Sequence, residues 1–314
     1  MIENLIFTAN AVAPIFAVIL LGAFLQRRGF LTDAFSRAAT QLVFYVGLPA
    51  LVFVKVAETD FETLFDVESV LSANVGTVLI FLVAWGLAAV VKMDFHSRGS
   101  FTQGAFRSNV AIFAFPVIYN VLGDRGLSAA IIILAFLMPI YNVFAVVVLA
   151  IHSKHEIRPN WVQSLCKIIT NPLIISALAG LALSMMQIRL PSWPQATCES
   201  LGSLAFPLGL LCIGTSLRFK DLTWSRDLVL AVVLKNIAAP LIMMGVACLM
   251  GVRGDLLVVL MLIAASPSAV AGFIMAAAMD NDARLAAAIV VATSAASVVT
   301  VSVAIFWLKS CGLI

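Results

Sequence analysis

The sequence predicts an all-α polytopic membrane protein of ten transmembrane helices, built as two inverted repeats of five. Three observations support this fold class. Of the 314 residues, 62% are hydrophobic and only 11% are charged, long uncharged stretches recur along the whole chain, and the two halves share the spacing of several prolines and glycines. A soluble chain carries about 25% charged residues, so the composition argues against a water-soluble globular protein.

Ten apolar stretches are candidate membrane spans. About 20 apolar residues in a helix cross a hydrocarbon core of about 30 Å. Two of the stretches, 38–54 and 108–123, reach that length only when they are extended past a flanking charge. In chain order the uncharged stretches that mark the ten candidate spans lie at 4–26, 38–54, 69–91, 108–123, 126–153, 168–188, 200–217, 236–252, 256–279 and 285–308.

An internal repeat appears when the sequence is shifted by 158 residues. The shift superposes Pro14 on Pro172, Gly22 on Gly180, Pro49 on Pro207 and Asp124 on Asp282. Each half holds five spans, an odd number, so the second half must insert upside down relative to the first. We expect a first repeat at 1–152, a cytoplasmic linker at 153–164 and a second repeat at 165–314. Chance similarity between two apolar halves is the alternative.

The basic residues indicate the orientation in the membrane. Thirteen Lys and Arg residues, Arg107 among them, fall in the odd-numbered loops and their flanks, against five in the even loops and the termini. Short basic loops stay in the cytoplasm, so both termini and the acidic loop at 58–68 are expected outside. The N-terminus lacks the basic region of a cleaved signal peptide, which favours a retained first helix.

Several functions are disfavoured by the polar residues. The net charge of +3 is small and scattered, which excludes nucleic acid as a partner. The five cysteines are odd in number and show no CxxC spacing, so we expect no metal ion and no disulfide framework. No nucleotide-binding, metalloprotease or nucleophile motif occurs. Catalytic residues and cofactors are therefore expected to be absent, and the protein is not expected to be an enzyme.

Two of the prolines inside apolar spans mark the candidate substrate site. Pro116 lies in the fourth expected span and Pro267 in the ninth, which are matching members of the two repeats. Interrupted spans at equivalent positions of two halves point to a transport site, because a broken helix exposes backbone N–H groups that attract anions. A simple kink is the alternative for each proline. The candidate substrate-binding residues are Asn109, Pro116, Tyr119, Asn120, Tyr141, Asn142, Ser266, Pro267 and Ser268.

Lys235 is the one ionisable residue that the pattern places well inside a span. It follows Asp227 by eight residues, which is about 12 Å of helix. A charge at that depth is a functional hypothesis by default, and with Asn236 it is a candidate for attracting an anion or coupling transport to protonation. The alternative is a lysine that extends to the cytoplasmic edge of the membrane. No Asp or Glu lies comparably deep, so no carboxylate relay is visible.

Seven segments along the chain are distinctive when they are taken together: VAPIFAVILLGAFLQRRG, VFYVGLPALVF, RSNVAIFAFPVIYNVLG, ITNPLIISALAGL, FPLGLLCIGTSL, LKNIAAPL and ASPSAVAGFIMAAAMDND. In this combination they resemble the auxin efflux carrier family. The match runs through nearly the whole length, and the chain is similar to the short bacterial branch, without the long central loop of plant members. The resemblance implies a sodium/proton-antiporter-like fold. Spans one, two, six and seven would form a scaffold, spans three to five and eight to ten a mobile transport domain, and helices four and nine would cross at Pro116 and Pro267.

The resemblance also implies a function. Family members carry organic anions, such as indole acetate in plants and malonate or other carboxylates in bacteria. The deep carboxylate of plant members in the third helix has no counterpart, since this span offers Asn74 and Thr77. The coupling ion, proton or sodium, therefore stays open.

We expect a secondary active transporter of small organic anions in the bacterial inner membrane. It would work by elevator-type alternating access, surrounded by lipid, with a homodimer through the scaffold helices left open. The alternatives are a ligand-binding membrane sensor and a sodium- or proton-coupled cation antiporter on the same fold.

Overall fold

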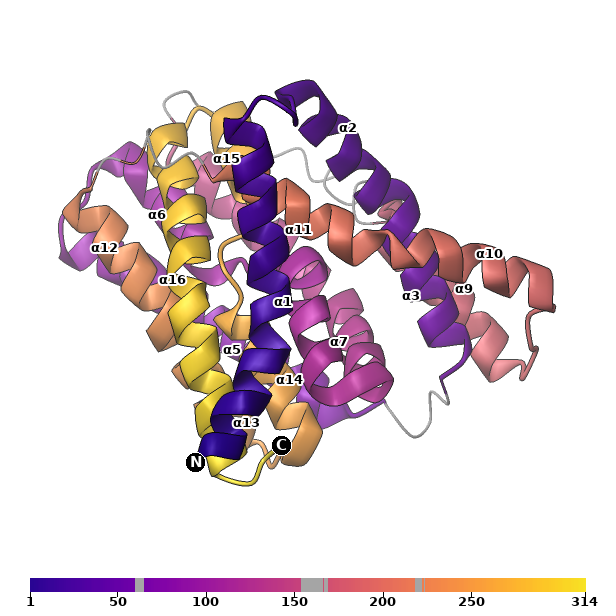
Figure 1. Ribbon diagram of the computed structural model, residues 1–314. Coiled ribbons are helices and arrows are strands. Elements are labelled where there is room, and N and C mark those ends of the chain that lie inside the picture. The colour runs from indigo at the N-terminus through magenta and orange to yellow at the C-terminus, as the bar shows by residue number, and fades with distance from the viewer. Residues whose placement is uncertain (60–64, 154–165, 167–168, 218–221, 223) are drawn as a thin grey trace. The chain divides into compact units, whose positions relative to one another are not determined.

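The computed structural model describes residues 1–59, 65–153, 166, 169–217, 222 and 224–314, and this part of the chain is helical apart from turns and one isolated β-bridge (Figure 1). Most of the expected linker at 153–164 and the centre of the acidic loop at 58–68 lie outside the described residues. Several basic residues used for the orientation, such as Lys154 and Arg158, lie outside them too.

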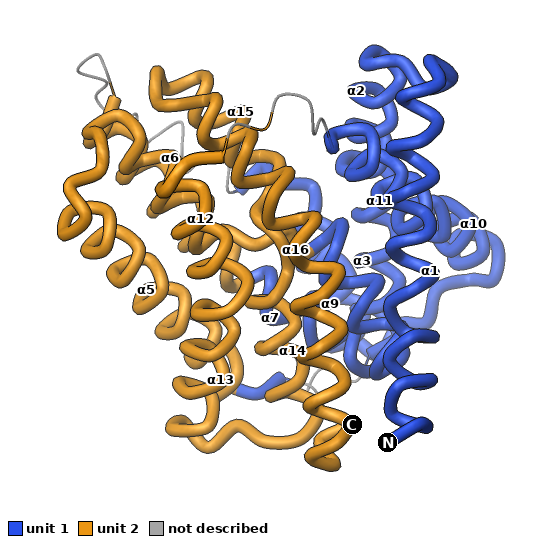
Figure 2. Tube along the Cα trace, turned by 60° about the vertical axis from the view of Figure 1, so that its left-hand side comes forward, with its two compact units in different colours: residues 1–66, 111–135, 166–217 blue, residues 67–110, 136–165, 218–314 orange. Residues whose placement is uncertain are grey.

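Contacts divide the chain into two compact units (Figure 2). Unit 1 comprises residues 1–66, 111–135 and 166–217, and unit 2 comprises residues 67–110, 136–165 and 218–314. Residues 111–135, which the sequence analysis assigned to a transport domain, group with unit 1. The chain therefore passes between the units within the fourth and the fifth expected spans.

The helices of unit 1 form two closely packed pairs, α1 with α11 and α3 with α9. In chain order its elements are α1 (Ile2–Arg27), α2 (Asp33–Leu42), the π-helix η1 (Val43–Gly47), α3 (Leu48–Ala57), most of the π-helix η2 (Val110–Ala114), the first part of α7 (Phe115–Ile151), α9 (Pro172–Met185), α10 (Ser192–Ser203) and α11 (Ala205–Ser216). Side-chain caps begin some of them. Thr32 accepts from the N–H of Phe35 at the start of α2, and Asn171 accepts from the N–H of Leu173 at the start of α9.

Glycines set the spacing within both pairs. A Cβ at Gly22 in α1 would overlap the carbonyl of Leu211 in α11, and a Cβ at Gly180 in α9 would lie 2.7 Å from the carbonyl of Phe53 in α3. Gly22 and Gly180 are 158 residues apart, and so are Phe53 and Leu211. The same backbone-on-backbone contact thus occurs twice in unit 1, at the offset of the internal repeat.

Unit 2 contains a helix, α6 (Phe95–Phe106), whose C-terminal two turns are completely buried. The elements of this unit are α5 (Val67–Val90), α6, the second part of α7, α12 (Arg226–Val233), the π-helix η4 (Leu234–Ala238), α13 (Ala239–Leu249), α14 (Gly254–Ala265), α15 (Val270–Ala278) and α16 (Ala283–Ser310). Residues 99–106 of α6 are all buried. Phe101 and Ala105 pack with Leu228 of α12 and Ile289 of α16 in one hydrophobic cluster, so the remaining faces of α6 can carry polar side chains without meeting lipid.

Seven described helices are long and apolar enough to cross a membrane, and α9 and α14 are shorter apolar helices. This supports a multi-pass membrane protein. The number differs from the ten expected spans because interruptions split or join them. The apolar run Val110–Ile151 covers two expected spans, and the backbone turns between them at Gly123, where φ is 66° and ψ is −156°. The arrangement as ten spans in two inverted repeats stays a prediction.

The expectation that Pro116 interrupts its helix is wrong. The helix runs from Val110 in η2 through Pro116 in α7, and the interruption lies earlier, between Phe106 and Val110. Pro49, Pro116 and Pro240 each follow a π-helix by two residues. In an α-helix the proline ring would contact the carbonyl of the preceding turn, and the wider π-turn moves that carbonyl away. The π-turn also shifts the hydrogen bonds by one residue, so the N–H that proline lacks is not needed at this position. In this chain these three prolines mark a widened turn.

Candidate functional site

Two helix interruptions meet in unit 2. α6 ends at Phe106 and α14 ends at Ala265, and each is followed by a short extended segment, 107–109 and 266–269. The segments run antiparallel. The N–H of Asn109 donates to the carbonyl of Pro267 at 2.9 Å, and the N–H of Ala269 donates to the carbonyl of Arg107 at 3.0 Å. We call this pair of segments the crossing. Its backbone groups satisfy each other where a helix ladder is missing.

Lys235 reaches the crossing from η4. Its side chain is 1% exposed, and its ammonium donates to the Ser108 Oγ at 2.6 Å and to the Ala264 carbonyl at 3.0 Å. Ala264 lies in the last turn of α14, where carbonyls lack helical partners and the helix dipole is negative. The ammonium therefore joins the segment after α6 to the carbonyl end of α14.

Arg107 is the second cation at the crossing, and counting it as a loop charge was wrong. It is 7% exposed, and its guanidinium donates to Asn142 Oδ1 at 3.0 Å and to the Met275 sulfur at 3.0 Å. The sequence analysis missed it because α6, with His96, Arg98 and Gln103, does not resemble an apolar span. One available signal was the repeat, since the offset of 158 residues places Arg107 on Ala265, directly before the second interruption.

Most of the other predicted residues also lie around the crossing. Tyr141 is buried beside Ser108, with its ring 6.0 Å from that of Phe106. Asn236 donates to the Thr293 carbonyl at 3.1 Å and to Thr300 Oγ1 at 3.2 Å. The predicted residues in unit 2 are Asn109, Tyr141, Asn142, Lys235, Asn236, Ser266, Pro267 and Ser268.

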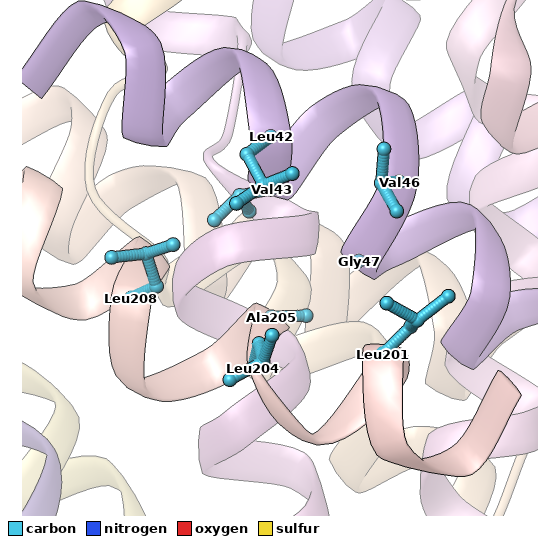
Figure 3. Close-up of a pocket in the computed structure, with 8 residues that line it drawn as sticks. All are labelled: Leu42, Val43, Val46, Gly47, Leu201, Leu204, Ala205 and Leu208. Atoms are coloured by element: carbon cyan, nitrogen blue, oxygen red, sulfur yellow. The ribbon is translucent and has the colours of Figure 1, made fainter. Parts of the chain in front are cut away.

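Three predicted residues belong to unit 1, and two of them, Tyr119 and Asn120, have partners there. Pro116 lies in the first turn of α7. The Tyr119 ring lies 6.3 Å from that of Phe206, and Asn120 donates to the Ala11 carbonyl at 3.0 Å. Unit 1 also holds an apolar groove lined by residues of α2, η1, α10 and α11 (Figure 3). No polar side chain lines this groove, so it offers nothing to hold a charged ligand.

The crossing holds two buried basic side chains, Arg107 and Lys235. In the described part of the chain neither Arg107 nor Lys235 has an Asp or Glu within ion-pair distance, and the ion pair found there, Lys55 with Asp124, lies in unit 1. The described residues hold no group of three His, Cys, Asp or Glu that could bind a metal ion.

In unit 2, two interrupted helices meet at buried charged and polar side chains. This arrangement is typical of membrane transport proteins. The family model described as membrane transport protein matches residues 7–305. The chain belongs to this family, the auxin efflux carrier family, and the resemblance drawn from the sequence is confirmed.

Named relatives are similar over most of their length. The chain is 24% identical to the uncharacterized transporter YfdV of Escherichia coli K12 over 283 residues, which are 87% of this chain and 88% of the relative. It is 21% identical to the uncharacterized transporter MJ1031 of Methanocaldococcus jannaschii over 309 residues, covering 93% and 96% of the two chains. These names describe transporters and state no substrate.

Proposed function

We propose that this membrane transporter is a secondary carrier of small organic anions, carboxylates above all. The observation that supports this is the pair of buried cations, Arg107 and Lys235, at the crossing, with no carboxylate partner among the described residues. A buried charge without a counter-charge is costly. A bound anion would compensate both cations, so binding an anion at this site should release more free energy than binding it at a neutral surface would.

Helix ends add to this preference. η2 begins at Val110 and α15 begins at Val270, each directly after one segment of the crossing. The first N–H groups of a helix have no helical acceptor and carry partial positive charge. Each such end favours an anion by about 0.3–1 kcal/mol. A cation antiporter would need carboxylates at this place, and the described residues of the crossing supply none.

We further propose ten spans in two inverted repeats, both termini outside, and elevator-type alternating access. The repeat is supported by the duplicated glycine contacts of unit 1, Gly22 with Leu211 and Gly180 with Phe53. It is also supported by the crossing, where the hydrogen-bonded residues Asn109 and Pro267 are separated by the repeat offset of 158 residues. Movement of a domain that contains the crossing would carry the bound anion from one side to the other.

Uptake by purified protein in liposomes tests the carrier proposal. The vesicles receive labelled mono- and dicarboxylates under imposed pH, sodium and voltage gradients, with protein-free liposomes as control. We expect saturable uptake of at least one carboxylate that excess unlabelled anion competes away. The gradient that drives uptake identifies the coupling ion. Sodium or proton flux with no carboxylate flux would contradict the proposal and support the cation antiporter.

A further inference from the structure

Two polar side chains lie next to each other at the end of α6. Gln103 is in the last turn of the helix, and Arg107 directly follows the helix end, four residues later. α15 packs against α6, and its Gly272 and Met275 lie opposite Gln103. Neither Gln103 nor Met275 is needed to explain how the two segments of the crossing pair.

Gln103 has an unused acceptor. The side chain is 1% exposed, and its amide nitrogen contacts the Met275 sulfur at 3.5 Å. Its Oε1 is buried and has no hydrogen-bond partner among the described residues. Buried amide oxygens in folded proteins nearly always accept a hydrogen bond. An acceptor left open beside the crossing therefore points to a donor supplied from outside the chain.

Arg107 has unused donors next to this acceptor. Its guanidinium has five N–H groups, and in the described structure it donates from one nitrogen to Asn142 and from another to the sulfur of Met275. A thioether is a weak acceptor, so Met275 is a poor partner for a guanidinium. Because Gln103 and Arg107 reach the same sulfur atom, one small molecule in its place could contact both.

We propose that Gln103 and Arg107 form a substrate subsite that selects carboxylates carrying a hydroxyl or N–H group. The carboxylate would bind the guanidinium of Arg107, which matches its geometry in a two-pronged contact. The hydroxyl or N–H of the same molecule would donate to Gln103 Oε1. This inference rests on the carrier proposal and narrows its substrate class to small molecules such as hydroxycarboxylates.

Met275 is the removable cover of this subsite. Its side chain is half-buried, and it lies on α15, a helix of nine residues. The preceding residue on this helix, Ile274, is 61% exposed. Methionine is unbranched and changes rotamer at little cost, so one side-chain movement frees both Gln103 and Arg107. Next to it, a Cβ at Gly272 would lie 3.7 Å from Gln103 Cδ. Glycine thus leaves room beside the amide that a larger residue would fill.

Uptake of matched substrate pairs tests the subsite. Purified wild type in liposomes is given lactate or propionate, and malate or succinate, since the members of each pair differ by one hydroxyl. We expect uptake of the hydroxylated member to exceed that of its partner by about three- to tenfold, the usual effect of one hydrogen bond. Gln103→Leu should remove this preference, because it should lower uptake of the hydroxylated member more than uptake of the unhydroxylated one. Arg107→Met should abolish uptake of both members, and Arg107→Lys should retain part of it.

Controls separate the possible failures. Gln26→Leu makes the same change in unit 1, and it should leave the preference intact. Apparent melting temperatures in detergent identify variants that fail to fold. If a variant fails to fold, the second measurement is the thermal stabilisation of wild type by each substrate, which should be larger with lactate than with propionate at equal concentration. Uptake of both members of each pair at equal rates, or a preference that survives in folded Gln103→Leu, overturns the subsite alone. Absence of any carboxylate uptake by wild type overturns the carrier proposal as well.

Discussion

The backbone N–H of Asn109 donates to the carbonyl of Pro267 at 2.9 Å, although 158 residues separate the two. With the bond from Ala269 to the Arg107 carbonyl, it holds together two extended segments. Each segment connects the end of one helix to the start of the next. Lys235 adds a side-chain link to Ser108 and Ala264. The side chains on these segments are thereby fixed relative to one another, which is what selective binding requires.

Removing the charge of Lys235 should reduce anion transport more than it harms folding. Lys235→Met leaves the Ser108 Oγ and the Ala264 carbonyl without their donor and removes one of the two cations. We expect carboxylate uptake to fall about tenfold or more, since a charge-assisted contact contributes about 1.5–3 kcal/mol. Lys235→Arg keeps the charge, so its carboxylate uptake should lie between that of wild type and that of Lys235→Met. The measurement is uptake across pH at matched membrane expression. Wild-type behaviour of both variants would make Lys235 a structural residue.

Alanine at Gly22 or Gly180 should destabilise unit 1. The added methyl group would meet the backbone carbonyl of Leu211 or of Phe53, and backbone cannot move aside as a flexible side chain can. We expect a loss of about 1–3 kcal/mol for each change, seen as a lower apparent melting temperature in detergent. Gly86→Ala in α5 is the matched control, because nothing lies within 4 Å of its Cβ position. Equal melting temperatures for Gly22→Ala and Gly86→Ala would show that the helices of this pair can separate at little cost.

Acidification should destabilise the protein through His152. This residue follows α7, just beyond the apolar run, and its Nδ1 lies 2.9 Å from the Val148 carbonyl with Phe95 and Trp85 around its ring. Burial lowers the pKa of His152, and the nearby charges of Arg98 and His96 lower it further. The unfolded chain therefore binds the proton more readily than the folded one. The stabilising effect is present above the unfolded pKa of about 6.5 and is lost as the pH falls through the lower folded value.

Thermal unfolding of His152→Gln checks this. Between pH 7.5 and 5 its apparent melting temperature should fall less than that of wild type. His96→Gln is a useful comparison, because His96 contacts the same helix end through the His152 carbonyl. An unchanged pH dependence in His152→Gln would assign the acid sensitivity to other groups.

The orientation predicted from the charges can be checked by labelling. In a background without the five native cysteines, Glu62→Cys should react with a membrane-impermeant maleimide added outside intact cells. Glu156→Cys should react only after the membrane is opened. The reverse pattern would place both termini in the cytoplasm and invert the sorting of the basic loops.

The sequence predicted best those helices that consist of one continuous apolar run between charged residues. The expected spans 69–91 and 285–308 differ by only a few residues from α5 (Val67–Val90) and α16 (Ala283–Ser310), because charged residues bound one continuous apolar run. α6 escaped prediction because hydropathy reports exposure to lipid, and residues 99–106 are buried within the protein. Arg107 was misassigned for the same reason.

At the site, the sequence could name residues but not their relations. Lys235 and the serines beside Pro267 stand out because they are polar within apolar runs. The open acceptor of Gln103 depends on which atoms of α15 lie opposite it, and this is determined only by packing. Pro116 misled because a proline within a helix marks either a break or, as here, a widened turn.

The crossing also has a consequence for biosynthesis. The amide of Asn109 and the carbonyl of Arg107 receive their partners from Pro267 and Ala269, which leave the ribosome long after residues 107–109 have been made. In the hydrocarbon of a membrane an unpaired backbone group costs several kcal/mol, so the early segment cannot settle alone in lipid. Until the later segment has been synthesised, water or another protein must satisfy the backbone groups of the early segment. A chain truncated before Ser266 would keep this defect permanently, which makes the crossing a point at which membrane quality control can distinguish a finished chain from an unfinished one.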